Sequence, residues 1–270
     1  MNKNGQHYYS RLLITGAAGK LGRIMRPRIK HYCKNIRISD IINIDDTNCN
    51  EEFINVDLKN SNDVDNLLEG VDCVLHFGGI SIERPFDEIL QANIVGIYNL
   101  YEAARKNGTR RIIFASSNHV TGFYKRDNII TPEDPFRPDS LYGVSKAYGE
   151  NLARLYYDKY GIETACLRIG SCCENPIDER MLHTWLSYDD LERLIVACLT
   201  SDVVNFTVIY GVSNNDIVWW NNESVNHINF QPKESSSVFI NMVNSYNKIT
   251  DINNLANIYQ GGNFVINKPI

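Results

Sequence analysis

The feature that most constrains the fold is a glycine-rich turn between a short apolar stretch and a segment with helical spacing. Residues 12–14 predict a strand, glycine then recurs at every third position, and a helix is expected to run to about His31. Because glycine has no side chain, such a turn can approach a pyrophosphate, which would lie against the first amides of the helix. The turn residues expected to contact a dinucleotide are Gly16, Gly19, Lys20, Leu21 and Gly22.

A carboxylate after the second predicted strand distinguishes between the two common nicotinamide dinucleotides. Asp40 follows the strand at 36–39 and stands 18 residues after Gly22. In that position a carboxylate accepts hydrogen bonds from the adenosine ribose hydroxyls and repels a 2′-phosphate. The sequence therefore predicts NAD rather than NADP, with a helix-capping role of Asp40 as the alternative. Gly78 and Gly79, after the fourth predicted strand, suit a wall that comes close to the same cofactor.

Strand-like and helix-like segments alternate along most of the chain. Further strands are expected at 36–39, 53–56, 73–76, 111–115, 164–169 and 206–210, and long helices at 88–106 and 142–160. Strands that alternate with helices pair in parallel through crossover connections. The predicted fold is therefore α/β, a doubly wound parallel sheet of the Rossmann type, with a small C-terminal substrate or cap region.

The chain of 270 residues is expected to divide into three parts around one main core. Residues 1–10 are polar and predict a disordered extension. Residues 11–211 carry the alternating pattern and predict the NAD-binding domain with the catalytic residues. In residues 212–270 Asn and Ser become frequent and helical spacing returns only at 237–246, which predicts a small substrate or interface region.

Composition argues against several other classes of protein. The chain has 27 Lys and Arg against 32 Asp and Glu, with no basic stripe, so nucleic acid is not an expected partner. The N-terminus lacks a secretory pattern and no apolar run approaches about 18 residues, so a cytoplasmic protein without membrane association is expected. The seven cysteines lack the C-x-x-C spacing, which predicts reduced structural thiols and no metal site, with the pair Cys172 and Cys173 left open.

A tyrosine and a lysine four residues apart predict acid–base chemistry. Tyr142 and Lys146 lie on a predicted helix capped by Asp139 or Ser140, so both side chains project from one face. Lowering the pKa of a phenol from about 10 to about 7 takes about 4 kcal/mol of phenolate stabilisation. An adjacent ammonium can supply much of that free energy.

Two serines at the end of the strand at 111–115 complete the pattern. Ser116 and Ser117 point in opposite directions if they continue the strand, so one of them can join Tyr142 and Lys146. In that arrangement the hydroxyl orients the substrate oxygen and the tyrosine exchanges its proton. The lysine holds both the phenolate and the nicotinamide ribose.

These residues resemble the extended short-chain dehydrogenases/reductases of the NAD-dependent epimerase/dehydratase superfamily, and more narrowly the uronate dehydrogenases. The resemblance covers about residues 11–270 and is most specific at 116–119 and at the Trp pair 219–220. Other stretches that carry it are 13–19, 76–81, 99–105, 168–172, 180–182 and 260–262. The chain departs from the family pattern at 120–123 and at Ala147, and neither departure removes a proposed catalytic group.

The resemblance implies that NAD oxidises C1 of a cyclic hexuronic acid, galacturonate or glucuronate, to the aldarolactone. Tyr142 would be the base, Lys146 would lower its pKa, and Ser117 rather than Ser116 would orient the substrate. Polar side chains would hold the sugar and a guanidinium would hold its carboxylate. The substrate-binding residues implied are Ser81, Ser117, Asn118, His119, Ser171 and Arg180.

The resemblance also bears on the rest of the cofactor site and on assembly. Asp57 would lie near the adenine ring, although a helix cap is almost as consistent with its spacing. The residues expected to line the cofactor beyond the glycine turn are Asp40, Ile41, Asp57, Leu58, Phe77, Gly78, Gly79, Tyr142, Lys146 and Ile169. Relatives assemble as homo-oligomers, so a homo-oligomer is expected.

Alternative interpretations remain for the function and for single residues. The chain could be a nucleotide-sugar epimerase or dehydratase, but about 60 residues after Gly211 leave little space for a UDP moiety. It could also be a non-catalytic NAD-binding regulator, against which the intact Ser, Tyr and Lys argue. His119 and Arg180 could have structural roles, and Trp219 and Trp220 are expected to be core or interface residues.

Overall fold

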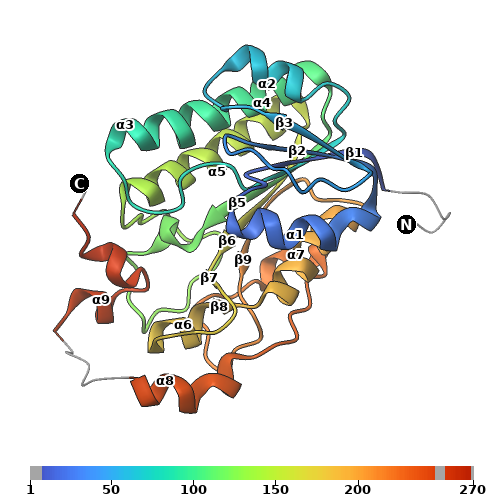
Figure 1. Cartoon of the computed structure of the whole chain (residues 1–270). Coiled ribbons are helices and arrows are strands. Elements are labelled where there is room, and N and C mark those ends of the chain that lie inside the picture. Colours follow the sequence, from blue (N-terminus) through green and yellow to red (C-terminus); the bar gives the residue numbers. More distant parts are fainter. Residues whose placement is uncertain (1–7, 247–252, 269–270) are drawn as a thin grey trace.

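The fold is a seven-stranded parallel sheet, seen in a computed structural model that describes residues 8–246 and 253–268 (Figure 1). Its strands are β1 (Tyr9–Thr15), β2 (Cys33–Asp40), β3 (Glu51–Asn55), β4 (Cys73–His76), β5 (Arg111–Ser117), β6 (Glu163–Ile169) and β9 (Phe206–Gly211). They are ordered β3-β2-β1-β4-β5-β6-β9. This order reverses direction next to β1, as the doubly wound prediction requires.

The first strand begins earlier than the sequence suggested. Tyr9 and Ser10 belong to β1 and not to a disordered extension, because Tyr9 pairs with Cys33 of β2 and its hydroxyl donates to Leu199 O at 2.8 Å. The rest of that predicted extension, residues 1–7, lies outside the described residues.

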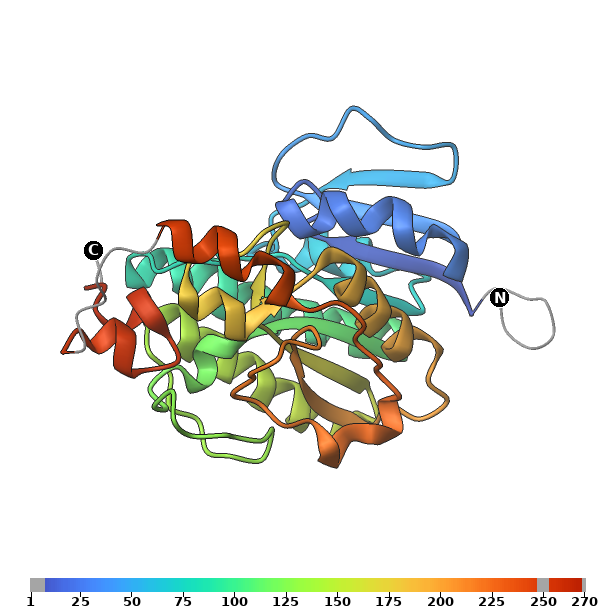
Figure 2. The same cartoon turned by 90° about the horizontal axis from the view of Figure 1, so that it is seen from below.

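Helices cover both faces of the sheet (Figures 1 and 2). One face carries α1 (Lys20–Ile29), η1 (Lys30–Tyr32) and α7 (Tyr188–Thr200); the other carries α2 (Ser61–Leu67), α3 (Phe86–Ile89), η2 (Leu90–Val95), α4 (Gly96–Asn107) and α5 (Leu141–Tyr160). Alternation along β1 supplies both cores, since Leu12 and Ile14 pack with the α1 and α7 side and Leu13 with the α4 and α5 side. Burial on both faces explains why the strands are almost continuously apolar.

The expected helix at 88–106 is interrupted by a π-helical turn, η2. The turn contains Asn93, whose side chain exchanges two hydrogen bonds with the backbone of Ile80 and donates to Ser145 Oγ at 2.9 Å. Local widening of a helix often accompanies such functional contacts. Helix α5, in contrast, is continuous, with Ser140 as its N-cap and Gly161 in the left-handed conformation after its last residue.

Most of the remaining elements lie toward the carboxyl ends of the strands. The remaining elements are η3 (Asn118–Thr121), β7 (Ser171–Cys172), α6 (Glu179–Thr184), β8 (Trp185–Leu186), η4 (Glu223–Ile228), η5 (Ser236–Phe239), α8 (Ile240–Tyr246), α9 (Leu255–Ile258) and η6 (Gly262–Val265). Of these, η4 lies along β9, where its His227 contacts Thr207 near the start of that strand. Trp219 and Trp220 are buried, and Trp220 stacks on Tyr210 of β9 with 4.9 Å between ring centroids. Its indole N–H donates to Gln260 Oε1 at 2.9 Å. The two tryptophans therefore act as core residues that anchor the C-terminal segment.

A buried ion pair and its hydrogen bonds link β5, β6 and β9 to α5. Arg168 of β6 contacts Glu150 of α5 at 2.9 Å, and both side chains are at most 2% exposed. Ser116 donates to the same carboxylate at 2.5 Å, and Arg168 donates to the Tyr210 hydroxyl at 3.0 Å. Every partner of this pair comes from a different element, so the pair fixes their relative positions.

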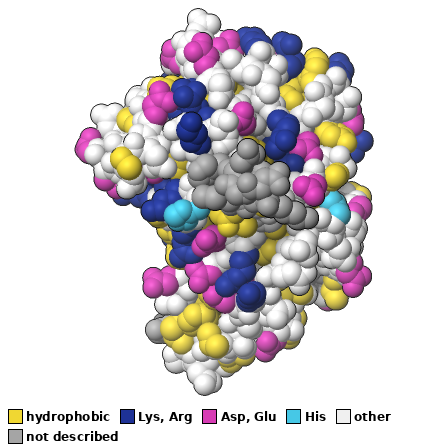
Figure 3. Space-filling view, turned by 90° about the vertical axis from the view of Figure 1, so that its right-hand side faces the viewer, with side chains coloured by type: hydrophobic (Ala, Val, Ile, Leu, Met, Phe, Trp, Pro, Cys, Tyr) yellow, Lys and Arg dark blue, Asp and Glu magenta, His cyan; other side chains and the backbone are white. Residues whose placement is uncertain are grey.

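Charges of both signs share the surface in view, and the cysteines are free thiols. Figure 3 shows Lys and Arg side chains interspersed with Asp and Glu on the face in view. Among the described residues, none of the helices has the length and apolar character needed to cross a membrane. All seven thiols are free, and burial raises the pKa of Cys172 to about 12, so this thiol stays protonated near neutral pH.

Candidate active site

The predicted site residues meet at the carboxyl edge of the sheet. They follow the ends of β1, β2, β4, β5 and β6, and the strand order reverses between β1 and β4. In doubly wound sheets, ligands bind in the crevice at such a switch point. Parallel pairing brings the segments after these strands together, and α5 and α6 add Tyr142, Lys146 and Arg180.

The glycine turn forms the cradle that a dinucleotide needs. Gly16 has a φ of +69°, and a Cβ on it would come within 2.6 Å of the Phe77 carbonyl carbon. A Cβ on Gly22 would overlap the Gly16 carbonyl oxygen. Gly19 is the N-cap of α1 and provides no side-chain cap, which leaves the first helical amides, at Lys20 and beyond, for an anion. These features fit a bound pyrophosphate.

Asp40 ends β2 beside this turn. One carboxylate oxygen accepts from Ala18 N at 2.9 Å and the other from Ile42 N at 3.0 Å. The carboxylate is therefore held at the adenosine side of the cradle, and Ile41 beside it is 66% exposed. Asp40 belongs to the end of β2, and the expected alternative of a helix cap is not seen.

The segments after β3 and β4 provide the facing wall. Leu58 lies against Gly78, where an added Cβ would sit 3.1 Å from the leucine side chain. Gly79 has a φ of +121°, and its Cβ would approach the Asn93 side-chain oxygen at 2.7 Å. Asp57 forms an ion pair with Lys59 at 2.9 Å and does not cap α2, whose N-cap is Asn60.

The strand and the helix that carry the acid–base residues lie side by side. Ser117 is the last residue of β5, and Tyr142 and Lys146 lie one turn apart on α5. Lys146 Nζ donates to Ala115 O at 2.8 Å and lies 5.7 Å from the centroid of the Tyr142 ring. Because Ser116 turns away to Glu150, Ser117 is the serine of the pair that is available to the site.

Burial dominates the protonation of this group. It raises the pKa of Tyr142 to about 12, although a hydrogen bond with Ser117 acts in the opposite direction, and it lowers the pKa of Lys146 to about 8. The expected lowering of the tyrosine pKa by Lys146 is therefore outweighed by burial. The reason is that the ammonium is engaged by Ala115 O and both groups are desolvated.

A second cationic group stands at the other side of the site. Arg180 of α6 donates to Gln260 O at 2.6 Å and to Ser171 Oγ at 3.2 Å. With its amide oriented to satisfy both neighbours, Asn118 accepts from Arg180 at 2.8 Å and donates to Ile169 O at 3.0 Å. Burial lowers the pKa of Arg180 to about 10, which still leaves the guanidinium charged near neutral pH.

His119 lies between this arginine and the tyrosine. Its ring stacks on Phe264 at 3.8 Å and meets the edge of Tyr142 at 5.9 Å, both between ring centroids. The structure thus brings His119, Asn118, Ser171 and Arg180 to one side of the acid–base residues. Ser81 is exposed on the loop after β4, which Asn93 ties to α5.

Several residues of the site were not found from the sequence. Glu83 accepts from the first amides of α5, Leu141 N at 3.1 Å and Tyr142 N at 3.0 Å. The side chains of Asn93 and Gln260 hydrogen-bond to the backbone of residues distant in the sequence, Ile80 and Lys125 respectively. A buried acidic residue beside Ser81 gave a weak signal at most, because a lone Glu in a loop is usually solvated.

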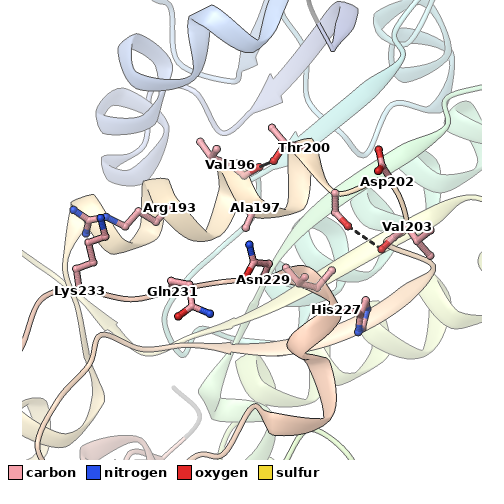
Figure 4. A pocket seen from close by; sticks show the side chains of 12 residues that line it. Arg193, Val196, Ala197, Thr200, Asp202, Val203, His227, Asn229, Gln231 and Lys233 are labelled. Carbon is pink, nitrogen blue, oxygen red and sulfur yellow. Dashed lines mark hydrogen bonds between the residues drawn. The ribbon is translucent and has the colours of Figure 1, made fainter. Parts of the chain in front are cut away.

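One hollow on the molecule lies away from these residues. A cavity of about 670 Å³ lies between α7 and residues 227–233 (Figure 4). Arg193 at its rim is already held by Asp190 at 2.6 Å, and His227 by Thr207 at 3.0 Å. Since none of the predicted site residues lines this cavity, it is separate from the candidate active site.

Comparison with known proteins supports the same interpretation. Residues 12–174 match the model of the NAD dependent epimerase/dehydratase family. The uronate dehydrogenase of Pseudomonas syringae pv. tomato is 49% identical over 262 residues, which cover 97% of this chain and 95% of that protein. The uronate dehydrogenase of Agrobacterium fabrum is 47% identical over 257 residues, which cover 95% of this chain and 97% of that protein.

Solved structures agree with the sequence comparison. A crystal structure of an Agrobacterium tumefaciens uronate dehydrogenase variant complexed with NAD has a TM-score of 0.94 at 45% identity, covering 97% of this chain and 99% of that one. Glucuronic acid dehydrogenase from Chromohalobacter salexigens has a TM-score of 0.95 at 45% identity, covering 96% of this chain and 98% of that one. Both similarities extend over the Rossmann sheet and the C-terminal segment.

Proposed function

Since the chain belongs to the uronate dehydrogenases of the NAD dependent epimerase/dehydratase family, we propose that it oxidises C1 of a free hexuronic acid with NAD, giving the aldarolactone and NADH. The observation that supports this most is the side of the site formed by Arg180, Asn118 and Ser171, next to Tyr142 and His119. A fixed guanidinium with polar neighbours suits a small carboxylate-bearing sugar.

The residues of the chain divide the reaction between them. NAD, when bound, supplies the acceptor for the hydride that leaves C1. Ser117 and Tyr142 hold O1 of the sugar, and the tyrosine, as the phenolate, takes the O1 proton as the carbonyl of the lactone forms. Lys146, whose ammonium lies 5.7 Å from the centroid of the Tyr142 ring, stabilises that phenolate. Arg180 holds the substrate carboxylate throughout.

The nucleotide-sugar alternative is weakened by the same geometry. The segment after β9 packs back on the sheet through Trp220 and Tyr210, and its Gln260 is held by the carbonyls of Lys125 and Asn128. These contacts tie the segment after Gly211 to the sheet, and its length of about 60 residues leaves little chain for a lobe that holds a nucleotide. A free uronate therefore fits the proposed site better than its UDP derivative.

The direct test is NADH formation by the purified protein. Galacturonate, glucuronate, neutral galactose and UDP-glucuronate are each supplied with NAD, and the NADH absorbance is followed. We expect turnover of the free uronates and none of galactose. Turnover of the UDP-sugar alone would replace the proposal by the nucleotide-sugar function, and NAD binding without any turnover would favour a regulator.

Replacing Arg180 with alanine is expected to lower kcat/KM for the uronate by about 30- to 100-fold, mainly through KM. A hydrogen bond to a charged group contributes about 2–3 kcal/mol, and about 1.4 kcal/mol corresponds to tenfold. Initial rates over a range of uronate concentrations check this, with Arg154→Ala on the exposed side of α5 as the control. Unchanged kcat/KM would remove Arg180 from the substrate site.

Replacing Asp40 with asparagine is expected to narrow the preference for NAD over NADP by about tenfold. Asparagine keeps an oxygen for Ala18 N but loses the charge that repels a 2′-phosphate, which is worth about 1.4 kcal/mol. The ratio of kcat/KM for the two cofactors measures the effect, and Asp63→Asn on α2 is the matched control. A ratio that stays at the parent value would assign cofactor choice to other residues.

We also propose that the enzyme is cytoplasmic and forms a homo-oligomer. The first part rests on the sequence, and the second on the resemblance to relatives that assemble as homo-oligomers. Light scattering on the purified protein tests the second part directly. A monomer at all accessible concentrations would contradict it.

A further inference from the structure

His119 is held in one orientation by a carboxylate that none of the roles above uses. Its Nδ1 lies 2.7 Å from Asp139 Oδ2, and the side chain of Asp139 is fully buried. The other carboxylate oxygen accepts from the Ser140 hydroxyl at 2.8 Å, and Ser140 is the N-cap of α5. Asp139 therefore connects the histidine to the start of the helix that carries Tyr142.

The backbone is shaped around this carboxylate. A Cβ on Gly122 or on Gly261 would overlap Asp139 Oδ2. These two glycines are themselves joined, since Gly261 N donates to Gly122 O at 2.9 Å. One belongs to the loop after β5 and the other to the C-terminal segment that also carries Phe264. The contact of both glycines with one oxygen leaves Asp139 little freedom to move away from His119.

The ring of His119 is fixed on its faces as well. Phe264 stacks on one side and Tyr142 meets it edge-on, as described above. Within the described part of the chain, Nε2 has no hydrogen-bond partner. An imidazole nitrogen that makes no hydrogen bond within the described part of the chain, next to Tyr142, is available to a ligand in the site.

We propose that Asp139 is a positioning residue that keeps the proton of His119 on Nδ1, so that Nε2 accepts a hydrogen bond from one hydroxyl of the sugar. The inference rests on the proposed uronate site and deepens it, because it assigns a direction to one substrate contact. A carboxylate can only accept, so the nitrogen that faces it must carry the proton. The other nitrogen of a neutral ring is then an acceptor.

The surroundings keep the ring neutral. Burial lowers the pKa of His119, and Asp139 opposes this without overcoming it. The other charged or titratable groups that face the ring are Arg180 from α6, Glu83 from the loop after β4, and Tyr142 from α5. A neutral ring near pH 7 has one donor and one acceptor, and Asp139 decides which nitrogen is which.

The first test observes the proton itself and needs no substrate. Long-range proton–nitrogen NMR of the histidine rings distinguishes the two tautomers, and loss of one set of signals in His119→Gln assigns His119. In the parent protein at about pH 7.5, we expect the neutral ring of His119 with its proton on Nδ1. In Asp139→Asn an amide can present either its oxygen or its N–H, so a mixture with the Nε2-protonated form is expected. A cation or an Nε2-protonated ring in the parent protein would overturn the proposal.

The second test uses the sugar. Uronates in which the hydroxyl at C2, C3 or C4 is replaced by fluorine cannot donate a hydrogen bond at that carbon. At one of these positions the parent enzyme should lose about tenfold in kcat/KM, mainly through KM, as expected for one hydrogen bond. In Asp139→Asn the penalty for fluorine should shrink, because part of the His119 population then donates from Nε2. A merely structural defect would lower the rates for hydroxyl and fluoro substrates alike.

A matched control and a fallback keep the outcomes distinct. Asp158→Asn removes a half-exposed carboxylate from α5, the helix that Asp139 precedes. It should change neither the tautomer of His119 nor the fluorine penalty. If Asp139→Asn does not fold, the NMR of the parent protein still decides the direction of the contact. Absence of uronate turnover in the parent enzyme would overturn the proposed function, whereas turnover with equal fluorine penalties in both proteins would overturn the role of Asp139 alone.

Discussion

Tyr142→Phe is expected to lower kcat for uronate oxidation by about 10²–10⁴-fold, the range over which a positioned general base contributes. Phenylalanine keeps the buried ring and its edge contact with His119, so the site should retain its shape. It lacks the oxygen that takes the O1 proton. Although Tyr142 is expected to line the cofactor, the glycine cradle and Asp40 carry the main proposed contacts and are unchanged, so NAD should still bind. Steady-state kinetics and NAD titration of the same preparation measure both quantities.

The control for this substitution is Tyr160→Phe at the exposed end of the same helix, which should leave kcat unchanged. Loss of NAD binding together with turnover would show that Tyr142 supports the fold and not the chemistry. Retention of turnover within a factor of about ten would rule out the tyrosine as the base.

Arg168→Met is expected to destabilise the protein by about 3–5 kcal/mol, the usual result of leaving one partner of a buried ion pair alone. Methionine is apolar and fills much of the same space, but the carboxylate of Glu150 then has only Ser116 as a polar partner from this cluster. Urea unfolding, with the midpoint and slope both measured, gives the change in free energy.

A second substitution separates the charge from the packing. Adding Glu150→Met to Arg168→Met should recover much of the loss, because no uncompensated charge then remains buried. Arg154→Met, which removes an exposed pair with Asp158 from the same helix, should not shift the urea midpoint measurably. If the double variant is less stable than Arg168→Met, the loss in Arg168→Met does not come from the unpaired charge of Glu150.

The sequence was most informative where the physical requirement is local. The glycine spacing, the alternation of strands and helices and the four-residue step from Tyr142 to Lys146 are each set by neighbours in the chain. They predicted the doubly wound sheet and the cofactor edge, and strand alternation predicted that Ser116 and Ser117 diverge. Even the early start of β1 and the π-helical turn left the order of elements unchanged.

The tertiary structure decided how the side chains of the site are paired and charged. Arg180 meets Gln260, and His119 meets Asp139, across segments whose separation in the chain gives no periodic signal. Burial raises the pKa of Tyr142, although its neighbour in sequence suggested the reverse. Local spacing determines the direction of a side chain from its own element, whereas desolvation and long-range contacts depend on what the rest of the chain packs around it. The sequence by itself thus determined the scaffold and predicted the cofactor edge, and only the folded molecule determined which groups share the buried space of the candidate site.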